Sequence, residues 1–190
     1  KVWDFLTGVG RDGSMPKSIF RSRVSVRKLK SLVKHYPADY DDEIERVLVP
    51  QVRGRGYFTK PEFEQICYWK TPRSRSKVAS NSAQYIECVT RTALTTDSEQ
   101  LRVEVLTLLN GVSWPTASVI LHFCHQDPYP ILDVRALWSL GVDAGQVIYN
   151  FDLWWGYTQV CRQLAKRAGL SMRELDRALW QYSKENQQGE

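Results

Sequence analysis

The sequence of 190 residues predicts an all-α fold. Apolar residues recur at helical spacing in most segments. Two pairs with capping-box spacing, Thr59 with Glu62 and Ser171 with Glu174, indicate where helices begin. The sequence contains no long alternation of apolar and polar residues that would indicate a strand. The length is enough for one compact domain or for two small lobes that share a core.

The first 60 residues predict two helices. Ser14 and Pro16 favour a helix that runs to about residue 34. A second helix is expected over about 41–52, with acidic residues in its first turn, and Pro50 kinks or ends it. The Arg-Gly-Arg-Gly run at 53–56 then breaks the chain.

The rest of the chain predicts further helices separated by Gly and Pro. The capping box at Thr59 opens a helix to Trp69, which the Thr-Pro pair at 71–72 ends. Thr95, Thr96 and Asp97 are expected to cap the helix before a central turn. The other helices are expected over about 82–93, over 151–168 with Gly169 as the end, and from the second capping box to about 185.

The positive charge is concentrated in the first part of the chain. Residues 1–80 hold 17 Lys and Arg against 9 Asp and Glu, whereas residues 81–190 hold 9 against 12. The basic residues form two runs, over 11–34 and over 70–77. Such runs suit a polyanion such as nucleic acid, although a solvated surface is the commoner explanation for a charge run taken alone. Tyr68 and Trp69 adjoin the second run, where they either stack on bases or belong to the core.

Composition limits the class of protein. No apolar run approaches the roughly 18 to 20 residues that span a bilayer, and no signal peptide is visible. The four cysteines are dispersed and form no CxxC pair, so they favour buried thiols in a reducing cytoplasm over a compact zinc or iron–sulfur site. We therefore expect a cytoplasmic protein, nucleoid-associated if bacterial.

The segment 106–140 carries the strongest functional signal. It predicts a helix, a turn at Gly111, a second helix opened by Ser113 and Pro115, a Pro-containing loop and then Asp133. Such a turn leaves free N–H groups at a helix N-terminus, where they bind an anion and position a DNA backbone. An ordinary αα-hairpin has the same pattern, and Asp133 alone is also a good helix N-cap.

The same segment resembles the helix-hairpin-helix DNA glycosylase superfamily. The matching parts are the run LNGVSWPTA at 109–117, the loop 125–130 and Ile131-Leu132-Asp133, about 35 residues with the flanking helix. The resemblance implies an all-α, two-lobed fold with a cleft between the lobes. The approximate lobes are 1–57 plus 150–190, and 58–149 with the hairpin at 101–124.

Two residues depart from the family pattern. Ser113 replaces the second Gly of the hairpin, and Pro115 stands where strand-cleaving members carry a catalytic Lys. The chain also lacks the closely spaced C-terminal cysteines that hold an iron–sulfur cluster in some members. The resemblance therefore implies a monofunctional glycosylase without cofactor or metal, which acts as a monomer on double-stranded DNA. Lys70 remains a possible substitute amine.

The resemblance and the chemistry together imply roles for individual residues. A carboxylate stabilises the oxocarbenium-like sugar and orients the attacking water, so Asp133 is the expected catalytic residue. The flipped base needs a pocket. The expected base-pocket residues are Tyr68, Trp69, Lys70, Arg73 and Asn81. The expected contacts to the DNA backbone are Asn110, Gly111, Ser113, Trp114, Thr116, Arg75, Lys77 and Arg135, the last of which could instead orient Asp133.

Other aromatic and histidine residues are expected to be structural. Trp138, Trp154, Trp155 and Trp180 are assigned to the core, and His122 and His125 to exposed or structural positions. Two alternatives to the enzyme stay open, a non-catalytic DNA-binding hairpin module and a helical protein whose basic face serves another partner. The candidate substrates are damaged purines, mismatched pyrimidines and hypermodified phage pyrimidines. DNA repair and defence against foreign DNA therefore both stay open as biological roles.

Overall fold

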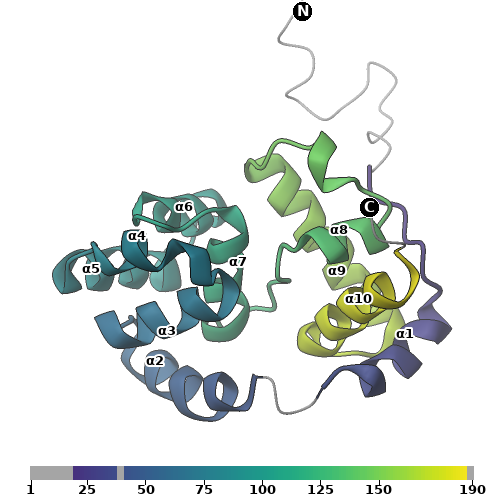
Figure 1. The fold of residues 1–190 in the computed structure, drawn as a ribbon, viewed down its shortest axis with the longest axis horizontal. Coiled ribbons are helices and arrows are strands. Elements are labelled where there is room, and N and C mark those ends of the chain that lie inside the picture. The colour runs from purple at the N-terminus through teal and green to yellow at the C-terminus, as the bar shows by residue number, and fades with distance from the viewer. Residues whose placement is uncertain (1–18, 38–40, 188–190) are drawn as a thin grey trace, which may run out of the picture.

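The computed structural model describes residues 19–37 and 41–187. These residues form helices and connecting segments and contain no strand, which confirms the predicted all-α class (Figure 1). Within the described ranges, no helix is long and apolar enough to cross a membrane. Three of the four cysteines are buried as expected, but Cys88 is exposed.

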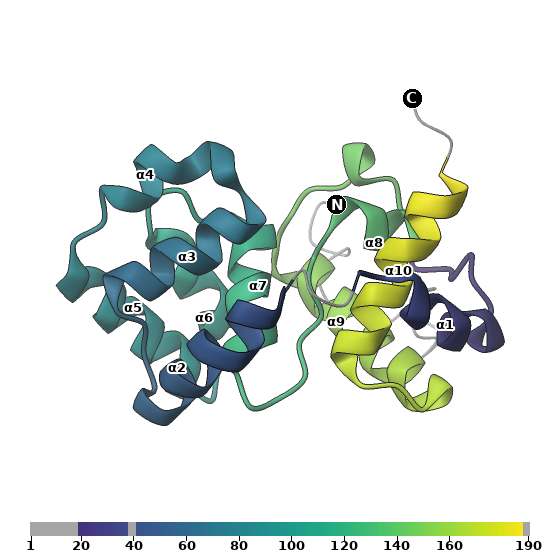
Figure 2. The same ribbon diagram turned by 60° about the horizontal axis from the view of Figure 1, so that its bottom comes forward.

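The helices form two groups (Figures 1 and 2). One contains the segment from residue 41 to α7, and the other contains α1 and the segment from α8 to α10. This division differs from the expected boundaries at residues 57 and 149. Helix α2, over Val49–Arg55, packs on α7, and α8 packs on α10.

The N-terminal helix is shorter than expected. In the helix expected over 14–34, residues 14–18 lie outside the described range and residues 19–25 are not helical. Helix α1 spans Val26–Leu32, where the Ser25 hydroxyl accepts a hydrogen bond from the Lys28 N–H, and a 3-10 turn, η1, follows at Val33–His35. The start moves because Ser25 provides an N-cap directly before buried Leu29 and Leu32.

The second helix continues past Pro50. A π-helical turn, η3, at Ile44–Leu48 leads into α2 at Val49–Arg55, which places Pro50 in the first turn of an α-helix. The missing N–H of proline costs least there. The chain breaks at Gly56 with φ 80°, three residues later than the start of the Arg-Gly run.

The next helices follow the predicted pattern closely. Helix α3 spans Lys60–Lys70 behind the capping box of Thr59 and Glu62, and Thr71 ends it. A 3-10 turn, η4, at Pro72–Ser74 leads to the short helix α4 at Arg75–Ala79. Helix α5 spans Ala83–Thr95 with Ser82 as its N-cap.

The hairpin consists of α6 at Glu99–Glu104, the 3-10 turn η5 at Val105–Leu108, and α7 at Trp114–Cys124. The N-cap of α6 is Ser98, which follows the expected residues 95–97. Ser98 is the cap because its hydroxyl accepts a hydrogen bond from the N–H of Leu101. The turn depends on Gly111, whose φ is 82°. A Cβ on Gly111 would lie 2.8 Å from Val78 Cγ2, so α4 packs directly against the turn.

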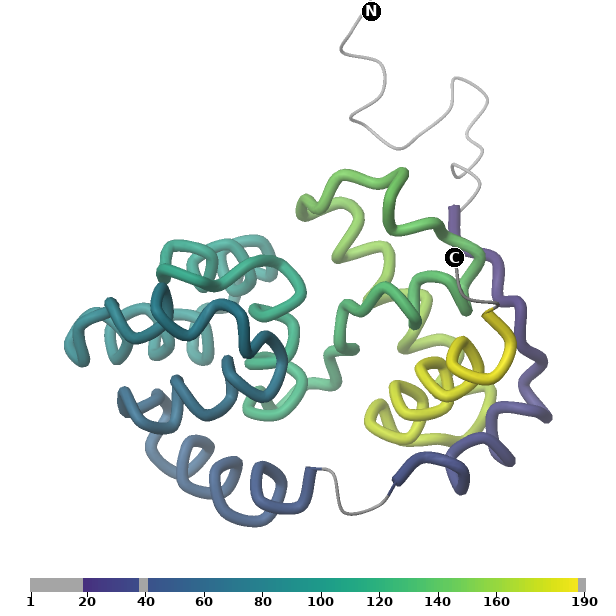
Figure 3. The backbone as a smooth tube through the Cα atoms, viewed as in Figure 1, coloured from purple at the N-terminus to yellow at the C-terminus, as the bar shows by residue number. Residues whose placement is uncertain are grey.

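The C-terminal helices complete the second group. Helix α8 spans Val134–Ser139, and the turn η6 at Ala144–Gln146 precedes α9 at Phe151–Ala168. Gly169 ends α9, and the capping box of Ser171 and Glu174 opens α10 at Met172–Asn186, as predicted. Figure 3 shows the chain crossing from α7 to α8 between the two groups.

A network of ion pairs ties the two groups together. Arg173 of α10 is paired with Asp41, and its Nε lies 2.9 Å from Glu45 Oε1. Arg177, one turn later, lies 2.8 Å from the same Glu45 oxygen. Asp41 is fully buried, and such a carboxylate is stable only because cations compensate its charge.

Candidate active site

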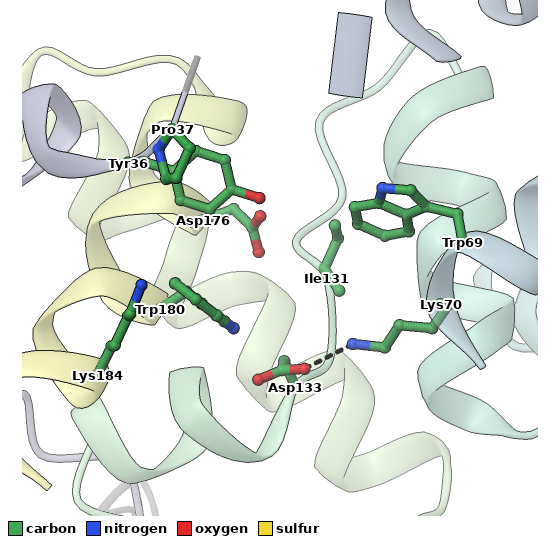
Figure 4. A pocket seen from close by; sticks show the side chains of 9 residues that line it. All are labelled: Tyr36, Pro37, Trp69, Lys70, Ile131, Asp133, Asp176, Trp180 and Lys184. Atoms are coloured by element: carbon green, nitrogen blue, oxygen red, sulfur yellow. Dashed lines mark hydrogen bonds and ion pairs between the residues drawn. The ribbon is translucent and has the colours of Figure 1, made fainter. Parts of the chain in front are cut away.

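A pocket of about 360 Å³ lies between the two groups of helices. Its residues come from four parts of the chain: the segment after α1, the end of α3, the segment before α8, and α10 (Figure 4). The lining residues are Tyr36, Pro37, Trp69, Lys70, Ile131, Asp133, Asp176, Trp180 and Lys184. The pocket therefore depends on residues that are distant in sequence.

Asp133 is the N-cap of α8 and also faces the pocket. Its backbone is extended, with φ −133° and ψ 143°, and its Oδ1 accepts a hydrogen bond of 2.9 Å from the Arg135 N–H. Its Oδ2 lies 2.6 Å from Lys70 Nζ. One oxygen thus fixes the carboxylate to the helix, while the side chain remains 21% exposed toward the pocket.

Three hydrogen bonds fix the segment that leads to Asp133. The N–H of Leu132 donates to Ser118 Oγ at 2.8 Å, and the carbonyl of Ile131 accepts from the Tyr157 hydroxyl at 2.8 Å. The Tyr129 carbonyl lies 2.6 Å from Nδ1 of His122. These bonds connect the segment to α7 and α9, so the carboxylate position follows from both groups of helices.

Lys70 reaches Asp133 because α3 ends at the pocket. The helix begins at its capping box and ends where Thr71 and Pro72 stop it, and Lys70 is its last residue. The Lys70 side chain is 15% exposed, and its ammonium pairs with Asp133. A half-buried ion pair of this length is stronger than an exposed one, because water screens it less.

Two indole rings form the walls. Trp69 Nε1 donates to Asp41 Oδ1 at 3.1 Å, and the ring meets Phe123 edge-on at 5.4 Å. On the opposite side, Trp180 meets Tyr36 edge-on at 5.6 Å. Aromatic walls of this kind suit a flat, aromatic ligand.

Arg135 lies beside the pocket, against the lining residue Trp180, and is not itself part of the lining. Its guanidinium carbon is 5.5 Å from the centre of the Trp180 ring, and its backbone N–H orients Asp133. Among the described residues it forms no ion pair within 4.0 Å. Its position leaves the guanidinium available to an anion beside the pocket.

Of the five residues expected in the base pocket, the structure brings together two, Trp69 and Lys70. Tyr68 is half-buried outside the pocket lining, with the Arg75 guanidinium carbon 4.9 Å from its ring centre. Arg73 is exposed in the turn η4, also outside the lining. Residues 68 and 69 point differently because neighbours on a helix are about 100° apart.

The expectation that Asn81 reads a base edge is wrong, because its side chain is buried. It is 2% exposed, and its Oδ1 accepts a hydrogen bond of 2.9 Å from the Asn110 N–H. Its Nδ2 donates to the carbonyls of Val78 at 2.8 Å and Asn110 at 3.0 Å. Asn81 therefore holds the end of α4 against the hairpin turn.

The hairpin turn exposes some of the expected DNA contacts and buries others. Asn110 and Ser113 are exposed, Gly111 and Trp114 are half-buried, and the Ser113 side chain makes no capping hydrogen bond. Thr116 is 1% exposed, so the expectation of a side-chain contact to DNA is wrong for this residue. It packs inward because it follows Pro115 on the face of α7 that meets the core.

The basic residues of α4 lie beside this turn. Arg75 and Lys77 are both exposed, and Lys77 Cβ would be 3.2 Å from a Cβ placed on Gly111. Lys77 therefore lies beside the hairpin turn, and Arg75, two residues earlier on α4, has its guanidinium over the Tyr68 ring.

Sequence reasoning missed the contribution of α10. Asp176, Trp180 and Lys184 are spaced four apart, so they share one face of the helix, and this face lines the pocket. Trp180 was expected in the core, but it is half-buried in the pocket wall, whereas Trp154 is fully buried as expected. The fourfold spacing was visible in the sequence, but nothing there indicated which element the face would meet.

The histidines are structural, as expected. Burial lowers the pKa of His122, which contacts the Tyr129 carbonyl, and burial also lowers the pKa of His125, which lies against Arg102.

No family model, no curated protein and no solved structure matches the chain. The function is therefore inferred from the site and from the motif at 109–133.

Proposed function

We propose that the protein is a monofunctional DNA glycosylase. It hydrolyses the N-glycosidic bond of a damaged, mismatched or modified base flipped out of duplex DNA, and it leaves an abasic site. The observation that carries the proposal is the position of Asp133, a fixed carboxylate in a pocket of about 360 Å³ with aromatic walls. This volume is within the usual range for small-ligand sites.

The arrangement of the helices supports the proposal. Residues of both groups line the pocket, which agrees with the two-lobed glycosylase-like fold that the motif implies. The hairpin belongs to the same group as Trp69 and Lys70, and in this proposal DNA held at the hairpin places one flipped nucleotide in the pocket.

Asp133 supplies the chemistry of the proposed reaction. Breaking the bond to the base places positive charge on the sugar, and a nearby carboxylate stabilises that charge. The same carboxylate orients the attacking water and accepts its proton. The cap to Arg135 and the contact with Lys70 hold the group in place, which reduces the reorganisation that the reaction requires.

The exposed hairpin turn and α4 supply the contacts to DNA in this proposal. The exposed turn before α7 and the cations Arg75 and Lys77 bind phosphates without reading sequence. Arg135, beside the pocket, binds the phosphate next to the flipped nucleotide.

The test is a panel of duplexes, each carrying one altered base, incubated with the protein and then treated with alkali to reveal abasic sites. Wild-type protein is expected to release the base from at least one member, and Asp133→Asn to release it about 100- to 1000-fold more slowly. Salt-sensitive binding to every duplex without any abasic product would refute the proposal and favour a non-catalytic DNA-binding module. Failure to bind duplex DNA at low salt would favour a helical protein with another partner.

A further inference from the structure

The pocket contains a second carboxyl group, that of Asp176. Figure 4 shows it pointing into the pocket from α10, apart from the pair of Lys70 and Asp133. The residue is 8% exposed. It lies on the same helix face as Trp180, so any flat ligand between the aromatic walls lies close to it.

The two oxygens of Asp176 differ in their surroundings. Oδ2 accepts a hydrogen bond of 2.7 Å from Arg173 Nη1, whereas Oδ1 has no hydrogen-bond partner in ranges 19–37 and 41–187. Arg173 also forms ion pairs with Asp41 and Glu45, and these two carboxylates compensate much of its positive charge. Asp176 therefore has an anchored oxygen and a second one available to a ligand.

Burial raises the pKa of Asp176. The nearby charges change the pKa of Asp176 in both directions. Arg173 of α10 and Lys70 of α3 oppose the rise, His122 of α7 opposes it when protonated, and Asp133 adds to it. Asp133, in contrast, is 21% exposed and pairs with Lys70, whereas the Arg173 guanidinium 2.7 Å from Asp176 is shared with two other carboxylates. Two carboxyl groups of one pocket in such different environments are suited to opposite roles, one as an acid and one as a carboxylate.

We propose that Asp176 is a catalytic general acid that protonates the departing base. This inference rests on the proposed function and adds the substrate class, which is an uncharged base. When the N-glycosidic bond breaks, its electron pair goes to the base, and an uncharged base leaves as an anion unless it receives a proton. A base that already carries positive charge leaves as a neutral molecule and needs no acid.

The step balances without any further reactant. The Asp176 carboxyl proton passes from Oδ1 to a ring nitrogen or carbonyl oxygen of the base, while the bond between the base and the anomeric carbon breaks. Water adds to the anomeric carbon and gives its proton to Asp133. The products are the free base and the abasic sugar, and exchange with solvent restores both carboxyl groups.

The test compares single-turnover base release by wild-type protein and Asp176→Asn. The uncharged probes are hypoxanthine, uracil and ethenoadenine, and the charged probe is guanine methylated on its imidazole ring. On uncharged bases, Asp176→Asn is expected to lose about 100-fold or more, the usual contribution of general acid catalysis. On the charged base, its rate is expected to stay within about threefold of wild type, because no proton is needed.

A pH profile separates an acid from a hydrogen-bond acceptor. The wild-type rate on an uncharged base is expected to fall as pH rises through the pKa of Asp176, and this dependence is expected to disappear in Asp176→Asn. Asp176→Glu retains a carboxyl group and should restore part of the rate together with the pH dependence. Thermal unfolding and duplex binding show whether each variant is folded.

Three results would overturn the proposal. They are equal losses on charged and uncharged bases, an Asp176→Asn rate on uncharged bases equal to that of wild type, and a wild-type protein that releases the charged base alone. If wild-type protein releases no base from any duplex, the proposed function itself has failed, which is a distinct outcome.

Discussion

Lys70 Nζ and Asp133 Oδ2 lie 2.6 Å apart, so the last residue of α3 meets the N-cap of α8 in the pocket. The two residues belong to different groups of helices and are 63 positions apart in the chain. Their contact completes the environment of the proposed catalytic carboxylate.

Asp133→Asn is expected to lower base release by about 100- to 1000-fold, because the amide cannot stabilise a cationic sugar. Asparagine is as good an N-cap as aspartate, so α8 should remain intact. Single-turnover assays measure the loss, and fluorescence anisotropy should show nearly unchanged affinity for duplex DNA. Full activity in this variant would refute the role of Asp133.

Borohydride treatment of the protein with abasic DNA is expected to trap no covalent adduct. Pro115 has no side-chain amine, and Lys70 Nζ is held 2.6 Å from Asp133 Oδ2, so neither residue presents a free amine to the sugar aldehyde. Lys70→Arg and Lys184→Arg provide the matched controls, since both lysines line the pocket. An adduct that disappears in Lys70→Arg alone would show that the protein is not monofunctional.

Asn81→Ala is expected to lower the free energy of unfolding by about 2 kcal/mol, because it leaves the Asn110 N–H and the Val78 carbonyl without their buried partner. Urea denaturation measures this change. The neighbouring exposed Ser82→Ala removes one helix cap and should cost about 1 kcal/mol. A stable Asn81→Ala with altered base preference would instead restore Asn81 as a base-reading residue.

Replacement of Arg75 and Lys77 by Gln is expected to weaken binding to every duplex alike. The slope of log affinity against log salt should fall by about 1.8, because each phosphate contact contributes about 0.9. Gln at Lys166 and Arg167, two exposed cations at the end of α9, is the control and should leave the slope unchanged. Equal effects of both pairs would exclude α4 as the DNA-binding surface.

The local signals in the sequence were sufficient for most helices. The structure confirms, within a residue or two, the helix boundaries predicted from the capping boxes at Thr59 and Ser171 and from Gly169 at the end of α9. These features act over one turn, so they can be interpreted without tertiary contacts. Asp133 was chosen as the candidate catalytic residue from the family resemblance, because its local pattern alone predicts a helix N-cap, and Lys70 was chosen from its place at a helix end beside the basic run.

The pocket could not be predicted to the same extent, because its walls meet only in the folded chain. Tyr36 and Asp176 are 140 positions apart, and no local pattern pairs them. Asn81 shows the opposite failure. A polar residue beside a basic loop suggested a ligand contact, but burial made it a structural clamp.

The ion pair of Lys70 and Asp133 also makes the charge in the pocket depend on how the two groups of helices are oriented. Lys70 is the last residue of α3 in one group, and Asp133 is the N-cap of α8 in the other, so a rotation between the groups would change the distance between Nζ and Oδ2. A bent duplex that forces the groups apart would free the carboxylate from its counter-ion. The negative charge offered to the sugar would then depend on the angle at which DNA holds the protein.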